Sequence, residues 1–136
     1  MAFTLDQRLQ NDCLHVCDLS LCRVLLMNDC QYPWLILVPR VADIAEIIDL
    51  TEQQQQTLWR ESAQASRVLQ SLYSPDKLNV AALGNVVAQC HVHHIARFHH
   101  DPAWPAPVWG QHPVTPYAED ELAATLDKLK LAFNPD

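Results

Sequence analysis

The ten residues from 89 to 98 carry the pattern that decides the fold, and they read Gln-Cys-His-Val-His-His-Ile-Ala-Arg-Phe. His91 and His93 stand two positions apart in a run that also holds Val92 and Ile95. Because side chains alternate between the two faces of a β-strand, both imidazoles are expected on one face. Paired neutral imidazoles can attack phosphorus, transfer protons or bind a metal ion. The run therefore predicts phosphate-ester chemistry or metal binding.

Composition and charge narrow the possible partners. At 136 residues the chain is expected to form a single domain with its own core. A formal net charge of −7 leaves no basic surplus to neutralise a phosphate backbone, so no nucleic-acid partner is expected. The negative net charge does not exclude a small nucleotide as ligand, because one cleft with backbone donors can hold it. The longest apolar run, residues 34–38, is too short to cross a membrane.

Signals for export and for phosphate loops are both missing from the sequence. The N-terminus lacks a charged start followed by an apolar segment, and the five cysteines form an odd number. These features predict reduced thiols and a cytoplasmic protein. The chain has two glycines, Gly84 and Gly110, from which neither a Walker A sequence nor a dinucleotide fingerprint can be written.

Hydrophobic periodicity and turn residues predict an α+β fold. We expect strands at 22–27, 34–38, 78–83 and 86–98, a long helix that begins at Thr51 and ends near Ser74, and a last helix over about 116–131 that Thr115-Pro116 begins. Thr4 suggests a capped turn or short helix, and residues 43–50 suggest a helical turn. Residues 14–18 are ambiguous, and residues 101–113 are expected to be irregular. The order of hairpin, helix and hairpin indicates a mainly antiparallel sheet of about five strands.

The His91-Val92-His93 motif, in this order of elements, resembles the histidine triad (HIT) family of nucleotide hydrolases and transferases, small bacterial members above all. The resemblance covers roughly residues 20–110. The segment 34–40 is similar to the family's apolar-Pro-basic strand end, and Trp104-Pro105 to a Trp-Pro segment after the triad. The resemblance implies a HIT-like fold, cleavage of a dinucleoside polyphosphate or nucleoside phosphoramidate at the α-phosphorus, and no cofactor.

The resemblance also implies roles for individual residues. The family's nucleophile is the middle histidine, which we place at His93; its Nε2 would attack phosphorus and form a nucleotidyl-histidine intermediate. His91 would help to position His93. The implied substrate contacts are Gln89 and Asn85 to the phosphate, and Asn28 and Asp29 to the ribose hydroxyls.

Two positions depart from the family pattern and leave alternatives open. The third triad position is Ile95, and Ala42 lies in the stretch where many members have a further histidine. The chain is therefore either an enzyme or a nucleotide- or metal-binding module without turnover. His94 is expected on the opposite face of the strand. A metal site that adds His94, His99 and His100 to the pair is the weaker alternative, since no acidic partner or Cys pair stands at ligand spacing. An unrelated α+β protein with incidental histidines is the third possibility.

The segment with Trp104 and Trp109 bears on assembly. Large aromatics among prolines in so small a chain are typical of core or subunit-contact residues, more than of a base-stacking platform. Many histidine triad proteins are two-fold dimers, so the resemblance implies a homodimer.

Overall fold

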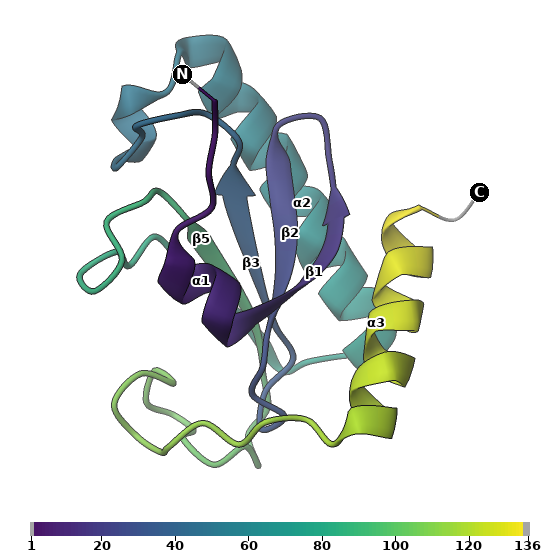
Figure 1. Cartoon of the computed structure of the whole chain (residues 1–136). Coiled ribbons are helices and arrows are strands. Elements are labelled where there is room, and N and C mark those ends of the chain that lie inside the picture. Colours follow the sequence, from purple (N-terminus) through teal and green to yellow (C-terminus); the bar gives the residue numbers. More distant parts are fainter. Residues whose placement is uncertain (1, 135–136) are drawn as a thin grey trace.

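A five-stranded antiparallel sheet carries the molecule, with helices on both of its faces (Figure 1). The computed structural model describes residues 2–134. In chain order its elements are α1 (Gln7–Asp12), β1 (Cys13–Asp18), β2 (Cys22–Met27), β3 (Trp34–Pro39), the 3-10 turn η1 (Ile47–Asp49), α2 (Glu52–Tyr73), β4 (Lys77–Ala81), β5 (Val92–Arg97) and α3 (Glu119–Phe133). The spatial order of the strands is β1-β2-β3-β5-β4. The predicted α+β class with its antiparallel sheet is confirmed.

Alternation along the strands divides the apolar residues between two cores. On one face, Val24, Leu35 and Val92 pack against Leu58 of α2 and Leu129 of α3. On the other face, the core joins one residue of α1, residues from the central strands and two residues of the loop after β5: Leu9, Trp34, Ile36, Ile95, Ala103 and Val108. Figure 1 shows α2 behind the sheet and α1 in front of it. The α1 side is the one that carries the histidine pair.

The long helix is the element that the sequence predicts best. Thr51 caps it: its hydroxyl accepts a hydrogen bond from the Gln54 backbone N–H, and the Gln54 side chain accepts one from the Thr51 N–H. This is the predicted capping box. The helix ends at Ser74, whose φ of 47° is left-handed. Both expected ends are confirmed.

Several element boundaries differ from the expectation. Residues 13–18 form strand β1, which the sequence pattern left open. Strand β5 spans Val92–Arg97 and not 86–98, because residues 86–91 form a loop fixed by other contacts, such as that of the Cys90 N–H with the Ile44 carbonyl. Strand β4 spans Lys77–Ala81 and not 78–83. The expected helical turn within 43–50 is η1.

The two terminal helices also begin later than the sequence suggests. The cap of α1 is Asp6, which accepts from the Arg8 N–H, and not Thr4. Helix α3 begins at Glu119, because the backbone N–H groups of Thr115 and Tyr117 bond to the side chains that end β2. Among residues 2–134, no helix has the length and apolar character that crossing a bilayer requires.

Candidate active site

The two histidines of the motif lie side by side on the α1 face of the sheet. His93 is in β5 and His91 directly precedes that strand. Their ring centroids are 4.8 Å apart, with the planes inclined by 74°. Both residues are buried, with 5% and 6% of their surfaces exposed. The pair is therefore preorganised by the fold and held largely away from bulk water.

A backbone contact fixes the tautomer of His91. Its Nδ1 lies 2.6 Å from the carbonyl oxygen of Gln89. A carbonyl oxygen can only accept, so Nδ1 must carry the proton. In the neutral imidazole the lone pair is then on Nε2, where it is available for attack.

His93 is held in the opposite tautomer. The indole Nε1–H of Trp34 donates to Nδ1 of His93 over 3.0 Å. An indole nitrogen only donates, so Nδ1 of His93 is the acceptor. The proton of neutral His93 is therefore on Nε2, which makes this atom a hydrogen-bond donor and not a nucleophile.

Burial keeps His93 neutral. Desolvation, followed by the effect of nearby His91, lowers the pKa of His93 from 6.5 to about 4, against an opposing hydrogen bond to the Leu83 backbone. The ring is thus neutral at pH 7, and the tautomer that Trp34 imposes persists over the physiological range.

A cavity of about 330 Å³ opens in front of the histidine pair. Its wall is mainly apolar, and its polar groups lie at the histidines, at Asn85 and on α1. The lining consists of Arg8, Leu9, Asp12, Cys13, Met27, Trp34, Ile36, Leu83, Asn85, Val86, Val87, His91, His93 and Trp109. An apolar cleft with a few convergent polar groups is the usual form of a small-molecule site.

Trp109 forms one wall of this cavity. Its ring meets His93 edge to face at 5.0 Å and Trp34 at 5.9 Å. Trp109 belongs to the irregular segment after β5, so its place depends on what holds that segment. The expectation of a core position fits this contact, although Trp109 also lines the cavity.

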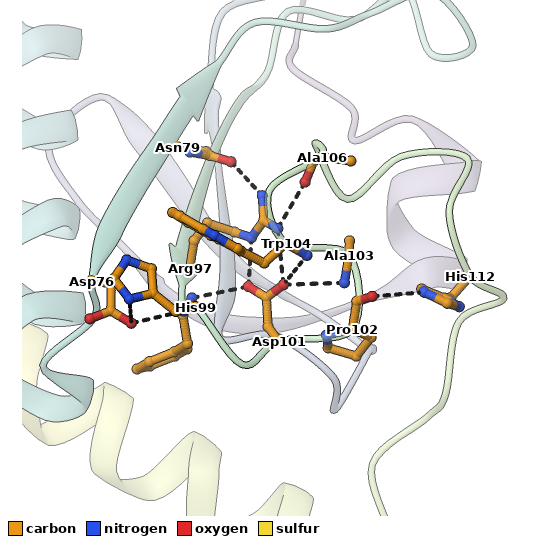
Figure 2. A network of polar contacts seen from close by, with 11 residues as sticks. Asp76, Asn79, Arg97, His99, Asp101, Pro102, Ala103, Trp104, Ala106 and His112 are labelled. Carbon is orange, nitrogen blue, oxygen red and sulfur yellow. Dashed lines mark hydrogen bonds and ion pairs between the residues drawn. The ribbon is translucent and has the colours of Figure 1, made fainter.

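The Arg97–Asp101 pair anchors that segment (Figure 2). The guanidinium of Arg97 donates to both oxygens of Asp101 at 2.8 and 3.0 Å, and to the carbonyl of Ala106 at 2.9 Å. Asp101 in turn accepts from the N–H groups of Phe98, Ala103 and Trp104. Arg97 and Asp101 are almost fully buried, so a buried ion pair holds the loop in place.

The loop after β4 also lines the cavity. Asn85, a predicted phosphate contact, lies in the cavity lining beside His91. Gly84 permits the tight turn, because a Cβ there would lie 2.8 Å from the carbonyl oxygen of Val87. The structure thus brings Asn85 together with His91 and His93.

The other predicted substrate contacts lie outside the lining of this cavity. The Asn28 side-chain oxygen accepts from the Tyr117 N–H, and Asp29 accepts from the backbone and side chain of Gln31. These residues hold the start of the C-terminal segment against the end of β2. The Gln89 amide accepts from the Asp6 N–H and donates to the Thr4 carbonyl. It ties the N-terminal segment to the strand that carries the histidines.

The remaining histidines of the run have separate places. His94 faces α2, fully buried, and its Nε2 lies 2.7 Å from the Ser62 hydroxyl oxygen. His99 and His100 are exposed. Ile95 is buried in the core on the pair's own face. Within residues 2–134, no three His, Cys, Asp or Glu side chains gather closely enough to bind a metal ion.

Comparison with known proteins decides the family. A family model described as "HIT domain" matches residues 8–100. The chain belongs to the HIT family. Proteins of this family are generally nucleotide hydrolases or transferases. No protein with a curated description matches the chain.

Solved structures of HIT proteins resemble this chain over nearly its whole length. A histidine triad protein from Marinobacter aquaeolei is 48% identical, with 99% of this chain and 98% of that one covered and a TM-score of 0.96. One from Bradyrhizobium japonicum is 45% identical, with coverages of 98% and 99% and a TM-score of 0.95. One from Sinorhizobium meliloti is 44% identical, with coverages of 93% and 94% and a TM-score of 0.91.

Three residues of this candidate site were missed by sequence reasoning. Trp34 stands in an apolar run and gave no sign of its role. The strand register could have revealed it, because His93 pairs with Ile36 and Ile95 pairs with Trp34. Arg8 and Asp12 belong to a short helix whose position on the sheet depends on contacts distant in sequence. Only the folded structure brings them to the cavity.

Proposed function

We propose that this HIT protein is a nucleotide hydrolase or transferase that cleaves a nucleoside phosphate at the α-phosphorus through a nucleotidyl-histidine intermediate. The supporting observation is the opposite tautomers of the histidine pair. They favour His91, and not His93 as expected from the sequence, as the attacking residue. A lone pair on Nε2 suits attack, whereas an Nε2–H suits donation.

The proposed reaction has two displacements. In the first, Nε2 of His91 forms a bond to phosphorus, and the leaving group departs with the electron pair of the broken bond and takes up a proton from solvent, which the second displacement returns. In the second, water adds to phosphorus, loses a proton, and the N–P bond breaks to release the nucleoside monophosphate and neutral His91. Transfer to an alcohol or amine in place of water follows the same course.

The neighbouring residues stabilise the transferred group. Neutral His93 donates from Nε2 to a phosphoryl oxygen on which negative charge increases in the transition state, and this oxygen takes the place of the Leu83 backbone as acceptor. The side-chain amide of Asn85, in the same lining, donates a hydrogen bond to another phosphoryl oxygen. Asn28, Asp29 and Gln89 act indirectly in this proposal, because their polar groups hold the C-terminal and N-terminal segments that border the site.

The proposal is tested by nucleotide release from a nucleoside phosphoramidate and from a dinucleoside polyphosphate, with and without a chelator. The wild-type chain should release the monophosphate whether or not the chelator is present. His91→Asn retains a donor toward the Gln89 carbonyl but lacks the nucleophile, so release should stop while the melting temperature changes little. The matched control is His99→Asn, an exposed histidine, which should leave the rate unchanged. Binding of nucleotide without release in the wild-type chain would support a module without turnover and contradict the proposal.

A homodimer formed through β4 is part of this proposal. The sheet has two edge strands, and β1 is protected by a register shift between His15 and Cys17. Strand β4 is only half-buried, with Val80 44% exposed, and the loop after it exposes Val86 by 75%. An unprotected edge is a template for pairing with a second copy. Val80→Glu should convert the dimer to a monomer in sedimentation, and a monomeric wild-type chain would contradict this part.

We also propose a reducing compartment such as the cytoplasm. All five cysteines are free, and Cys30 is the exposed one. Cysteines that form no disulfide are typical of proteins in a reducing compartment.

A further inference from the structure

Arg8 and Asp12 are charged residues of the cavity that the proposed reaction does not use. They lie one turn apart on α1, with Nε of Arg8 3.5 Å from Oδ2 of Asp12. Their side chains are 65% and 45% exposed, so both reach solvent as well as the cavity. Among the lining residues they are the cation and the carboxylate.

The fold holds this pair in place. Asp6 caps the first turn of α1 through the Arg8 N–H at 2.8 Å. The Asp12 carbonyl accepts from the Asn28 N–H at 3.1 Å, which attaches the end of the helix to the end of β2. Leu9, between them, is buried with Trp34 and Ile36. The two charged side chains therefore extend from an anchored helix.

Strand register places Asp12 at the end of the cavity remote from His93, and the Arg8 side chain reaches Asp12 from the first turn of α1. His93 of β5 is opposite Ile36 of β3, Ile36 is opposite Leu25 of β2, and Met27 of β2 is opposite Cys13 of β1. Asp12 directly precedes Cys13. Three strand spacings separate β5 from β1, which is roughly 14 Å between backbones.

From the histidines to the charged pair, the residues that line the cavity match the successive parts of a nucleotide. The histidines and Asn85 suit a phosphate, and Leu9, Cys13, Met27 and Ile36 form an apolar middle that suits the faces of a base. The charged pair then meets the edge of the base. This assignment rests on the proposed function, because it takes the phosphate to lie at His91.

We propose that Arg8 and Asp12 recognise the edge of guanine, so that the preferred substrates are guanine nucleotides. Guanine offers N1–H and N2–H side by side, which match the two oxygens of a carboxylate, and O6 and N7, which match a guanidinium. Adenine places the N1 acceptor against the carboxylate and is disfavoured. Because both side chains are partly solvated, the preference for GMP over AMP is about tenfold.

Calorimetric titration of the whole chain with GMP, IMP, AMP and ribose 5-phosphate tests the proposal. GMP should bind about tenfold more tightly than AMP, with IMP between them because it lacks the N2 amino group. Asp12→Asn exchanges a pure acceptor for an amide that also donates, so the ratio should fall to one or reverse in favour of AMP. Arg8→Met should weaken GMP binding and leave ribose 5-phosphate binding unchanged. The matched control is Asn11→Ala on the same helix, whose side chain bonds to Gln7 and is outside the cavity lining; it should preserve the ratio.

Three outcomes would overturn the proposal. AMP binding as tightly as GMP to the wild-type chain removes the guanine preference while leaving the proposed function intact. A uniform loss with Arg8→Met that includes ribose 5-phosphate would assign Arg8 to the phosphate. Absence of binding by every nucleotide would overturn the proposed function together with this inference.

Discussion

Trp34 and His93 are joined by a 3.0 Å hydrogen bond from the indole Nε1 to Nδ1 of the imidazole, across the neighbouring strands β3 and β5. The bond decides which nitrogen of His93 carries the proton. The two histidines therefore have opposite tautomers, since the Gln89 carbonyl holds His91 in the other one. Trp34 thus sets the tautomer of a histidine on the adjacent strand.

Trp34→Phe should lower kcat without abolishing it. The phenyl ring fills most of the same space but cannot donate, so His93 is free to adopt either tautomer. The loss of one buried hydrogen bond, about 1 kcal/mol, corresponds to about a fivefold lower kcat. Steady-state kinetics measures it, with the half-exposed Trp59→Phe as the control. An unchanged kcat in Trp34→Phe would show that the tautomer of His93 does not matter.

Acidification should destabilise the fold between about pH 6.5 and pH 4. Burial lowers the pKa values of His93 and His94 from 6.5 to about 4, so the unfolded chain binds more protons than the folded chain in this window. Stability therefore falls as the pH falls, by up to about 1.4 kcal/mol per pH unit for each ring. The lowered pKa values of Asp18 and Asp101 act in the same direction at lower pH. Urea denaturation at several pH values measures the slope, and constant stability from pH 6.5 to pH 4.5 would contradict it.

Removal of the Ser62 hydroxyl should cost stability but not activity. Ser62→Ala leaves Nε2 of the fully buried His94 without its 2.7 Å partner. An unsatisfied buried polar group costs about 1–3 kcal/mol. Ser71→Ala, at an exposed position of the same helix, should stay within about 0.5 kcal/mol of wild type. Loss of nucleotide release by folded Ser62→Ala would indicate that the far face of the sheet takes part in catalysis.

Asp101→Asn should be among the most destabilising single changes. It leaves the buried guanidinium of Arg97 without its charge partner, at a cost of about 3–5 kcal/mol. Asp18→Asn removes a partly exposed partner of Arg23 and should cost less than about 1 kcal/mol. Denaturant midpoints compare the two. Equal effects would mean that the loop carrying Trp109 is held by other contacts.

The sequence predicted those elements whose signals are local. Thr51 and Gln54 cap their helix without help from elsewhere, and the alternation of His91, Val92 and His93 sets one face of β5. The start of α3 was wrong because Asn28 and Asp29, far away in sequence, fix the backbone of residues 115–117. Helix α1 reaches the site through contacts with β2, and these contacts could not be predicted from hydrophobic periodicity.

Within the site, residue types were predictable and their roles were not. The pair of imidazoles could be located from spacing alone, but the choice between them depends on Trp34 and on the Gln89 carbonyl. Each partner makes a hydrogen bond to one ring nitrogen, and the sequence does not specify which ring nitrogen faces which neighbour. The same holds for Gln89, whose amide was expected at the phosphate and instead bonds to residues 4 and 6.

The assignment of His91 as the nucleophile is tested most directly by locating the covalent intermediate. A nucleoside phosphoramidate is mixed with the protein, the reaction is quenched in alkali within the first turnover, and the modified peptide is sequenced by mass spectrometry. We predict a nucleotidyl group on His91, its absence in His91→Asn, and slower formation on His91 in His93→Asn. A nucleotidyl group on His93 would contradict the account.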